Sequence, residues 1–266
     1  MKLDRATAIR QHLFSRGYSS IGDIAEAVGA SEPTIRRDLV LLAADGAIIR
    51  SHGGARIAEQ SGAEIAFESR AQINLPAKRA IAEAAFCLLR PDTSVFLDAG
   101  TTVLQLARRL RLNPMPLRIF TNCLPVAQVL MPVGGLSGGG PSGGGLSVTL
   151  LGGLLRPQNS SMVGLLAEAA LERLWFDHLF LGAGSIAADA GIYSADAQEA
   201  AINRKMLGRC NRPVLLADSD KFGQPLTYLV APIQPAMHVI CDDRLSRDWQ
   251  DRLAATGAAL TLAAVS

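Results

Sequence analysis

From residue 77 onward, short apolar runs alternate with segments of helical periodicity, and this alternation limits the possible folds more than any other feature of the chain. Short runs rich in Val, Ile, Leu and Phe are typical of strands that are buried on both faces. Strands separated by helices predict an α/β domain with an open, mainly parallel sheet and helices on its faces. The predicted strands are SVFLD at 94–98, LRIFT at 117–121, SVTLLG at 147–152, HLFLGA at 178–183, PVLLAD at 213–218 and AMHVIC at 236–241.

The N-terminal residues have a different pattern, in which three short helices precede a glycine turn. Apolar residues recur there at helical spacing, and Ser20 and Ser31 are placed to cap the second and third helices. Two short β-segments follow around Gly53-Gly54. Three helices and a hairpin predict a small winged helix-turn-helix domain over 1–57.

Composition marks the boundaries between the predicted parts. A chain of 266 residues is long enough for two domains. Residues 58–76 have weak periodicity and suit a linker or a loosely docked helix, so we expect the second domain at 77–266. The run GGLSGGGPSGGG at 134–145 lacks the Lys-Ser or Lys-Thr of a phosphate-binding loop, which favours a flexible surface insertion.

Charge and cysteine content exclude several classes of protein. A net charge of +2 is too small for DNA binding by bulk attraction, so any DNA contact must come from locally placed arginines. The N-terminus has no apolar signal core and no run reaches the roughly 18 apolar residues of a membrane helix, so we expect a cytoplasmic protein without membrane contact. The cysteines form no CxxC pair, which predicts neither a zinc site nor a disulfide framework, and no metal or cofactor is expected; they are Cys87, Cys123, Cys210 and Cys241.

The third predicted helix carries a pair of arginines that suits a recognition helix. If Ile35 and Leu39 face the core, Arg36 and Arg37 project outward, where a guanidinium fork can bind guanine or clamp a phosphate. The alternative is a solvated helix face, partly neutralised by Asp38. Serine and threonine at the helix start, and the wing after it, add donors for the DNA backbone. The predicted DNA-binding residues are Ser31, Thr34, Arg36, Arg37, Arg50, His52, Gly53, Gly54 and Arg56.

In the second domain, the sequence Asp98-Ala-Gly-Thr-Thr102 follows a strand and opens a helix. Glycine permits close approach of a ligand, threonines add hydroxyls, and the helix start offers free N–H groups, so this segment predicts an anion cradle. Polar or glycine-containing segments also end the next four predicted strands, and parallel strands would bring all of them to one edge of the sheet. The predicted effector-binding residues are Asp98, Gly100, Thr101, Thr102, Asn122, Gly152, Gly153, Gly184, Asp218 and Lys221.

Structural roles compete for these residues, because Thr and Asn often cap helices and Gly often marks turns. Glu199, Arg204 and Lys205 lie on a predicted helix where a solvated charged face is the expectation and a pocket role the alternative. Cys123 follows Asn122 but has no assigned base nearby, which favours a packed thiol over a nucleophile.

Two sets of motifs resemble the DeoR family of bacterial transcriptional regulators. IGDIAEAVGASE at 21–32, TIRRDL at 34–39 and SHGGA at 51–55 resemble the family's DNA-binding head. The resemblance implies a sensing domain similar in fold to ribose-5-phosphate isomerase and a phosphorylated sugar or polyol as inducer. The chain departs from the family pattern at Asn203, where lysine is expected, and at Asp220, where serine is usual. The motifs similar to the effector-binding half are DAGTT, SSMVG at 160–164, FLGAG at 180–184 and ADSDKFG at 217–223.

Together with this resemblance, the residues predict a repressor of carbohydrate-metabolism genes, without catalytic residues, that binds double-stranded operator DNA as a dimer or higher homo-oligomer. A dimer is expected because one short recognition helix reads too few bases. The alternative is a sugar-phosphate isomerase with a DNA-binding head, in which Asp98, Asp218 and Lys221 would shuttle protons and stabilise charge.

Overall fold

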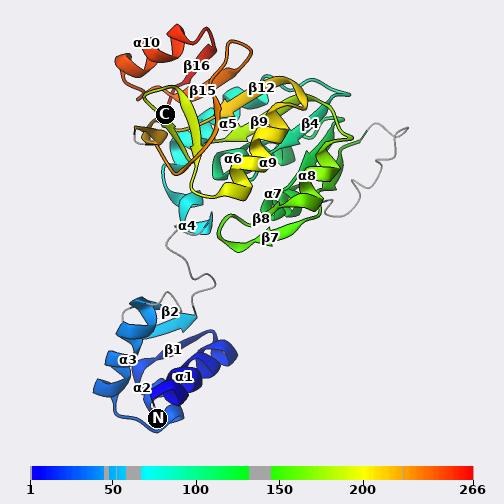
Figure 1. Ribbon diagram of the computed structural model, residues 1–266. Helices are drawn as coiled ribbons and strands as arrows, with labels where there is room; N and C mark the ends of the chain where they lie inside the picture. The colour runs from blue at the N-terminus through cyan, green and yellow to red at the C-terminus, as the bar shows by residue number, and fades with distance from the viewer. Residues whose placement is uncertain are drawn as a thin grey trace. The chain divides into compact units, whose positions relative to one another are not determined.

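The computed structural model describes residues 2–44, 48–51, 53–57, 67–131, 145–223 and 225–265. The chain forms two compact units, Met1–Ala66 and Phe67–Ser266 (Figure 1). The larger unit thus starts inside the stretch 58–76 that the sequence assigns to a linker, because Phe67 and Ala71 of α4 (Phe67–Gln72) are buried. His52 and residues 134–144 of the expected insertion lie outside the described residues.

The smaller unit has the three predicted helices and a three-stranded antiparallel sheet in the order β1-β3-β2. Ser20 caps the second helix, where its Oγ accepts a hydrogen bond from the N–H of Asp23 at 3.1 Å. Gly29 ends that helix at a φ of 67°, in the left-handed region that favours glycine. The elements are α1 (Lys2–Arg16), β1 (Tyr18–Ser20), α2 (Ile21–Val28), α3 (Glu32–Ala44), β2 (Ile48–Ser51) and β3 (Gly54–Ile57).

Strand β1 is not among the predicted elements, and it explains the second wing glycine. A Cβ at Gly54 would overlap the carbonyl oxygen of Ser19 and the ring of Tyr18, because β1 pairs antiparallel with β3 beside it. Gly53 instead supplies the turn, with a φ of 80°. The helices pack beneath this sheet on a core of Ile9, Leu13, Ile24, Ala25, Ile35, Leu39, Leu42, Ile48 and Ala55.

The larger unit contains a seven-stranded sheet in which every neighbouring pair of strands is parallel, which confirms the predicted α/β fold. All six predicted strands belong to it. The seventh, β16, lies at an edge of the sheet and is half exposed, so it lacks the apolar run of a buried strand. In spatial order the strands are β16 (Ala259–Ala263), β15 (His238–Asp242), β12 (Cys210–Leu216), β9 (Phe176–Gly182), β4 (Ser94–Leu97), β5 (Arg118–Thr121) and β6 (Ser147–Leu150).

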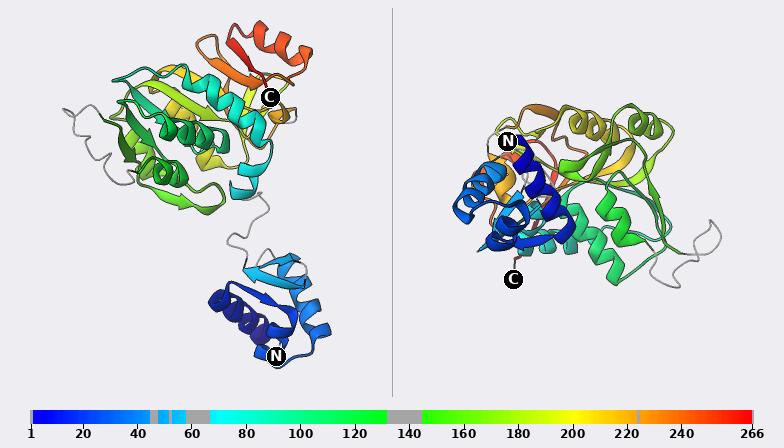
Figure 2. Two further views of the ribbon diagram at one scale, coloured as in Figure 1. Left: turned by 180° about the vertical axis from the view of Figure 1, so that it is seen from behind. Right: turned by 90° about the horizontal axis from the view of Figure 1, so that it is seen from below.

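Helices cover both faces of this sheet (Figures 1 and 2). Alternate strand residues face opposite layers: Val95 and Leu97 pack in one core cluster, whereas Phe96 packs in the other. None of the described helices has the length and apolar character needed to cross a membrane. One face packs on α5 (Leu75–Phe86), α6 (Thr101–Leu112) and α7 (Leu124–Leu130), and the other on α8 (Leu165–Leu171), α9 (Ala197–Leu207) and α10 (Arg247–Ala255).

Two small sheets complete the larger unit. Their strands have two to five residues each and no long apolar run, so the sequence does not predict them. One sheet has the order β13 (Phe222–Gly223), β10 (Ser185–Ala187), β11 (Gly191–Ser194) and β14 (Tyr228–Pro232), and the other pairs β7 (Leu154–Arg156) with β8 (Ser161–Val163).

The strand order reverses at β4, and this reversal positions the site. From β4 the chain adds β5 and β6 on one side, and then returns to place β9, β12, β15 and β16 on the other. In open parallel sheets, ligands bind outside the carboxyl ends of the strands at such a switch point. The carboxyl ends of β4 and β9 are therefore where a ligand is expected.

Candidate nucleic-acid interface and effector site

Helix α3 presents both arginines to solvent. Arg36 Nη2 lies 3.2 Å from Glu32 Oε2, in an ion pair whose side chains are each more than half exposed. Arg37 is exposed and has no hydrogen bond or ion pair with any residue that the structure describes. Asp38 instead accepts two hydrogen bonds from the guanidinium of Arg5 on α1, at 2.6 and 3.1 Å. Asp38 is thus paired with Arg5 of α1, so it does not neutralise Arg36 and Arg37.

Other predicted DNA-binding groups also lie on the surface of the smaller unit. At the start of α3, the hydroxyls of Ser31 and Thr34 are 2.9 Å apart. Arg50 on β2 and Arg56 on β3 are exposed. Hydroxyl and guanidinium groups of this kind contact the phosphates of DNA.

At the switch point, Asp98 joins β4 to β9. Its side chain is buried, and its Oδ2 accepts a hydrogen bond from the N–H of Gly182 at 3.1 Å. Burial raises the pKa of Asp98 to about 7, an effect reduced by backbone hydrogen bonds and increased by the charge of Glu199. A Cβ on Gly100 would lie 3.3 Å from the Cα of Gly182, so the strand ends approach as closely as glycine allows.

The start of α6 has the features of an anion cradle. Gly100 is the N-cap residue and no side chain caps the first turn. Thr101 and Thr102 are buried, and their hydroxyls have no hydrogen-bond partner in the described part of the chain. The helix has 12 residues, so its free N–H groups and dipole favour an anion at this end.

Asn122, after β5, presents an unpartnered oxygen. Its side chain is 1% exposed, and its Nδ2 donates to the carbonyl of Met162 at 3.2 Å. Its Oδ1 has no partner among the described residues, and such a buried group costs about 1–3 kcal/mol. A hydroxyl of a bound ligand would satisfy it. Cys123 is buried and burial raises the pKa of its thiol to about 12, which is the behaviour of a packed thiol.

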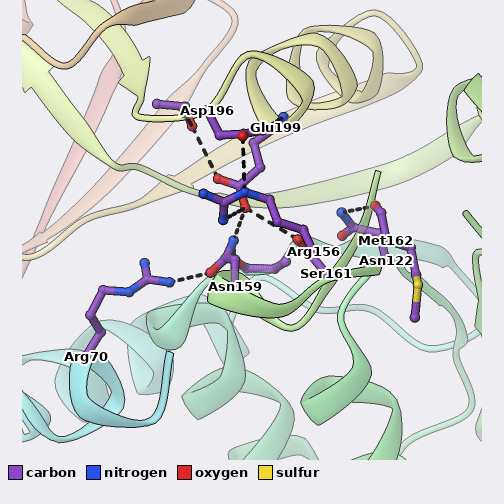
Figure 3. A network of polar contacts seen from close by, with 10 residues as sticks. Arg70, Asn122, Arg156, Asn159, Ser161, Met162, Asp196 and Glu199 are labelled. Atoms are coloured by element: carbon purple, nitrogen blue, oxygen red, sulfur yellow. Dashed lines mark hydrogen bonds and ion pairs between the residues drawn. The ribbon is translucent and has the colours of Figure 1, made fainter. Parts of the chain in front are cut away.

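Glu199 on α9 is the centre of a polar network that includes residues of β7, of β11 and of the segment between β7 and β8 (Figure 3). Its Oε1 accepts hydrogen bonds from Asn159 Nδ2 at 2.5 Å and from Arg156 Nη1 at 3.1 Å. Its Oε2 accepts from Ser194 Oγ at 3.2 Å. Asn159 also donates to the carbonyl of Ala99, next to the switch point, at 2.9 Å.

Glu199 therefore belongs to a buried polar network and not to a solvated helix face, since its side chain is only 13% exposed. The two basic residues weighed with it do not join the network. Arg204 donates to the carbonyls of Leu229 and Val230, and Lys205 forms an ion pair with Glu172 at 2.8 Å.

The loop after β12 brings in Asp218 and Lys221. Asp218 is 2% exposed, and its Oδ1 accepts a hydrogen bond from Asn74 Nδ2 at 3.1 Å. Asp220, one of the departures from the family pattern, accepts from the same nitrogen at 2.7 Å. The ammonium of Lys221 is half-buried and bonds to none of the described residues. Burial lowers its pKa, although the charge of Asp218 opposes this change.

Of the three remaining predicted glycines, two have packing reasons for their identity. A Cβ at Gly153 would lie 2.7 Å from the carbonyl oxygen of Val163, and one at Gly184 would lie 2.6 Å from that of Tyr193. Gly152 is exposed and faces open space. The close contacts of Gly153 and Gly184 are thus with strands of the small sheets.

Several polar residues of the site were not singled out from the sequence. One of them carries a signal: Lys78 falls on the apolar face of α5 with Ile81, Ala82 and Ala85, where a lysine is out of place. The others lie in segments without periodicity, and only the fold brings them together. The residues missed are Arg70, Asn74, Lys78, Arg156, Asn159 and Ser161.

Comparisons with known proteins cover both units. The model of the DeoR-like helix-turn-helix domain matches residues 5–61, and that of the DeoR C terminal sensor domain matches residues 73–243. The putative aga operon transcriptional repressor of Escherichia coli O157:H7 is 31% identical over 261 residues, which are 97% of this chain and 93% of that protein. The lactose phosphotransferase system repressor of Streptococcus mutans is 31% identical over 84% of this chain and 85% of that protein. Among solved structures, ribose 5-phosphate isomerase A from Neisseria gonorrhoeae matches with a TM-score of 0.35 and 12% identity, over 55% of this chain and 52% of that one.

Proposed function

The chain belongs to the DeoR family of transcriptional regulators, and we propose that it represses carbohydrate-metabolism genes until a phosphorylated sugar or polyol binds its larger unit. The observation that carries this proposal is a set of polar groups at the carboxyl ends of the parallel strands that have no partner among the described residues. The ammonium of Lys221 suits a phosphate, and the buried oxygen of Asn122 suits a sugar hydroxyl. The hydroxyls of Thr101 and Thr102 supply further donors at the start of α6.

In the DNA complex, α3 would enter the major groove with Arg36 and Arg37 toward the bases and the phosphates. The hydroxyls at the helix start and the arginines of the wing would hold the backbone. We infer at least a homodimer, because two such heads are needed to read enough base pairs for specificity. Because it would bind operator DNA, we infer that the protein acts in the cytoplasm.

The class of regulated genes is inferred from the relatives. One is named as a repressor of the aga operon and another as a repressor of a lactose phosphotransferase system. A phosphorylated sugar, as product of uptake or of the first metabolic step, would then report that the substrate of the regulated enzymes is present.

We expect no catalytic turnover. Asp98, with a pKa of about 7, is the group that would suit a general base. However, its Oδ2 is held by the N–H of Gly182, so it already connects two strands. Incubation with pentose and hexose phosphates should therefore leave them unchanged.

The test is operator binding by the full chain, measured by fluorescence anisotropy with duplex DNA from its own promoter region. Replacement of Arg36 and Arg37 by Ala should abolish the binding, whereas Arg79→Ala, which removes an exposed arginine of the larger unit, should not. A panel of phosphorylated sugars and polyols should contain at least one member that weakens the binding. Equal retention by the double variant would overturn the proposed DNA interface.

A further inference from the structure

Helix α3 has two large apolar side chains on its solvent-facing side. Ile35, Leu39 and Leu42 face the core of the smaller unit and are at most 4% exposed. Val40 is 49% exposed and Leu41 is 62% exposed. The core of the smaller unit therefore explains the first three residues of this helix, but it does not explain Val40 or Leu41.

Val40 is also an unfavourable residue for an exposed position inside a helix. It lies in the interior of α3, where a β-branched side chain forms helix less well than Ala, Lys or Glu. In a helix, Val has one strongly preferred side-chain rotamer, so its two methyl groups form a rigid apolar surface. A rigid group loses little conformational entropy when it binds a partner. Val40 is thus better suited to an intermolecular contact than to helix formation.

The place of Val40 beside the two arginines follows from helix geometry. Residues three and four positions apart are neighbours on a helix surface, with about 5–6 Å between their Cβ atoms. Val40 is four positions after Arg36 and three after Arg37, so it lies between them and one turn further along α3. Helical side chains lean toward the N-terminus of the helix, which directs Val40 toward both arginines.

Four exposed residues of α3 have the spacing of residues that read bases. Pro33, Arg36, Arg37 and Val40 occupy positions i, i+3, i+4 and i+7. The residues that read bases along the third helix of a homeodomain have the same spacing. Leu41, at i+8, falls outside this series. If α3 lies in the major groove, Val40 is therefore the apolar residue placed at the edges of the bases.

The charge around Val40 indicates what kind of partner covers it. Arg37 has no partner among the described residues, and Arg36 pairs with the exposed Glu32 at 3.2 Å. A second copy of this face would bring like charges together, whereas the phosphates of DNA are attracted to it. In the major groove, the apolar group that a base pair presents is the C5 methyl of thymine. An apolar side chain placed against the polar edge of another base would leave that edge without its hydrogen bonds.

We propose that Val40 reads a thymine of the operator through van der Waals contact with its C5 methyl group. The inference rests on the proposed function and adds a specificity-determining residue and the base that it selects. Arg36 and Arg37 bind guanine or phosphate through hydrogen bonds, so they do not recognise a methyl group. In a dimeric operator, each half-site then has one thymine in contact with Val40.

Replacement of thymine by deoxyuridine tests this contact, because deoxyuridine lacks the C5 methyl and keeps the hydrogen-bonding groups of the base. The probe is a duplex from the protein's own promoter region that the wild-type full chain prefers to random duplex. Its thymines are replaced one position at a time, in both half-sites together where the half-sites repeat. Fluorescence anisotropy gives the Kd of each duplex for the wild type, Val40→Ala, Leu41→Ala and Arg37→Ala.

For the wild type we expect one thymine position to respond, with a Kd raised about fourfold for each methyl removed, as the transfer of one apolar carbon group predicts. Val40→Ala should bind the thymine duplex about as weakly as the wild type binds the deoxyuridine duplex, and its own response should be less than twofold. Leu41→Ala, the matched control, should keep the full response. Arg37→Ala should weaken both duplexes by the same factor and keep the ratio of their Kd values.

Thermal unfolding shows whether Val40→Ala is folded. This variant should be at least as stable as the wild type, because Ala is the better helix former at an exposed position.

The inference is overturned, while the proposed function stands, if the wild type prefers its promoter and no thymine position responds. It is also overturned if Val40→Ala keeps the wild-type response, or if Leu41→Ala removes it. If the wild type does not distinguish its promoter from random duplex, the proposed function itself fails.

Discussion

Lys221 offers a sharp test of the effector site because its ammonium is half-buried and forms no hydrogen bond or ion pair with the residues that the structure describes. The substitution Lys221→Met keeps most of the apolar stem and removes the charge. Burial lowers the pKa of Lys221, so the free protein holds this charge at a cost. We therefore expect the variant without ligand to be at least as stable as the wild type.

The response to ligand should change in the opposite direction. A probe at 100 times its Kd stabilises the wild type by about 2.7 kcal/mol. For a unit of this size, 1 kcal/mol raises the Tm by about 2–4 °C, which gives a shift of roughly 5–11 °C. Loss of one charge-assisted hydrogen bond removes about 1.5–3 kcal/mol of binding free energy, which raises the Kd of the probe roughly 10- to 150-fold. At the same concentration the shift then falls to about half or less.

The assay is thermal unfolding of both proteins, with and without the sugar phosphate that stabilises the wild type most. The unphosphorylated sugar serves as the control, because it lacks the group that Lys221 would bind. The reasoning is refuted if Lys221→Met is less stable without ligand and keeps the full ligand-induced shift. That pair of results would mean that the ammonium supports the fold and does not contact the effector.

Three further predictions concern other parts of the molecule. Arg37→Ala should weaken operator binding by about 1–3 kcal/mol per half-site and reduce the salt dependence of that binding, because Arg37 has no partner in the described part of the free protein. Anisotropy titrations at several salt concentrations check this, and an unchanged Kd for the operator contradicts it. The pKa of Asp98 in the folded protein, about 7, lies above its ordinary value of 3.8, so ionisation of this carboxyl disfavours the folded state. As the pH rises from 4 to above 7, the free energy of unfolding of the wild type should therefore fall by up to about 4 kcal/mol relative to that of Asp98→Asn. Urea unfolding at several pH values measures this, and a difference in stability that does not change with pH argues against a buried carboxyl with a raised pKa. Gly54→Ala should destabilise the smaller unit by about 1–3 kcal/mol, because its Cβ would overlap β1. Gly22→Ala, which has room for a Cβ, should not. Equal stability of the two variants in thermal unfolding would disprove the close pairing of β1 with β3 at Gly54.

Local sequence patterns predict the framework of both units well. The run at 94–98 alternates between two core clusters, as Val95, Phe96 and Leu97 show, so its apolar residues identify a strand covered on both faces. Ser20 and Gly29 bound α2 as their capping chemistry predicts. Strands and helix caps depend on residues that are close in the chain, so they can be predicted from the sequence.

The site is less predictable because its contacts join distant segments. Arg70 and Asn159 are 89 positions apart, and Asn159 and Glu199 are 40 apart, so no local pattern reveals either hydrogen bond. Glu199 shows the consequence: from the sequence alone we expect a charged helix residue to face solvent, whereas the fold buries its side chain among distant polar residues. Lys78 is the exception, because a lysine on an apolar helix face indicates a buried charge before any fold is known.

The most direct test of the account is a titration of the purified full chain against duplex from its own promoter region and against random duplex of equal length, at several salt concentrations. We predict a preference for the promoter of roughly a thousandfold or more, and its loss when the right sugar phosphate, but not the free sugar, is added. Equal affinity for the two duplexes, or a promoter complex indifferent to every sugar phosphate tested, would contradict the account.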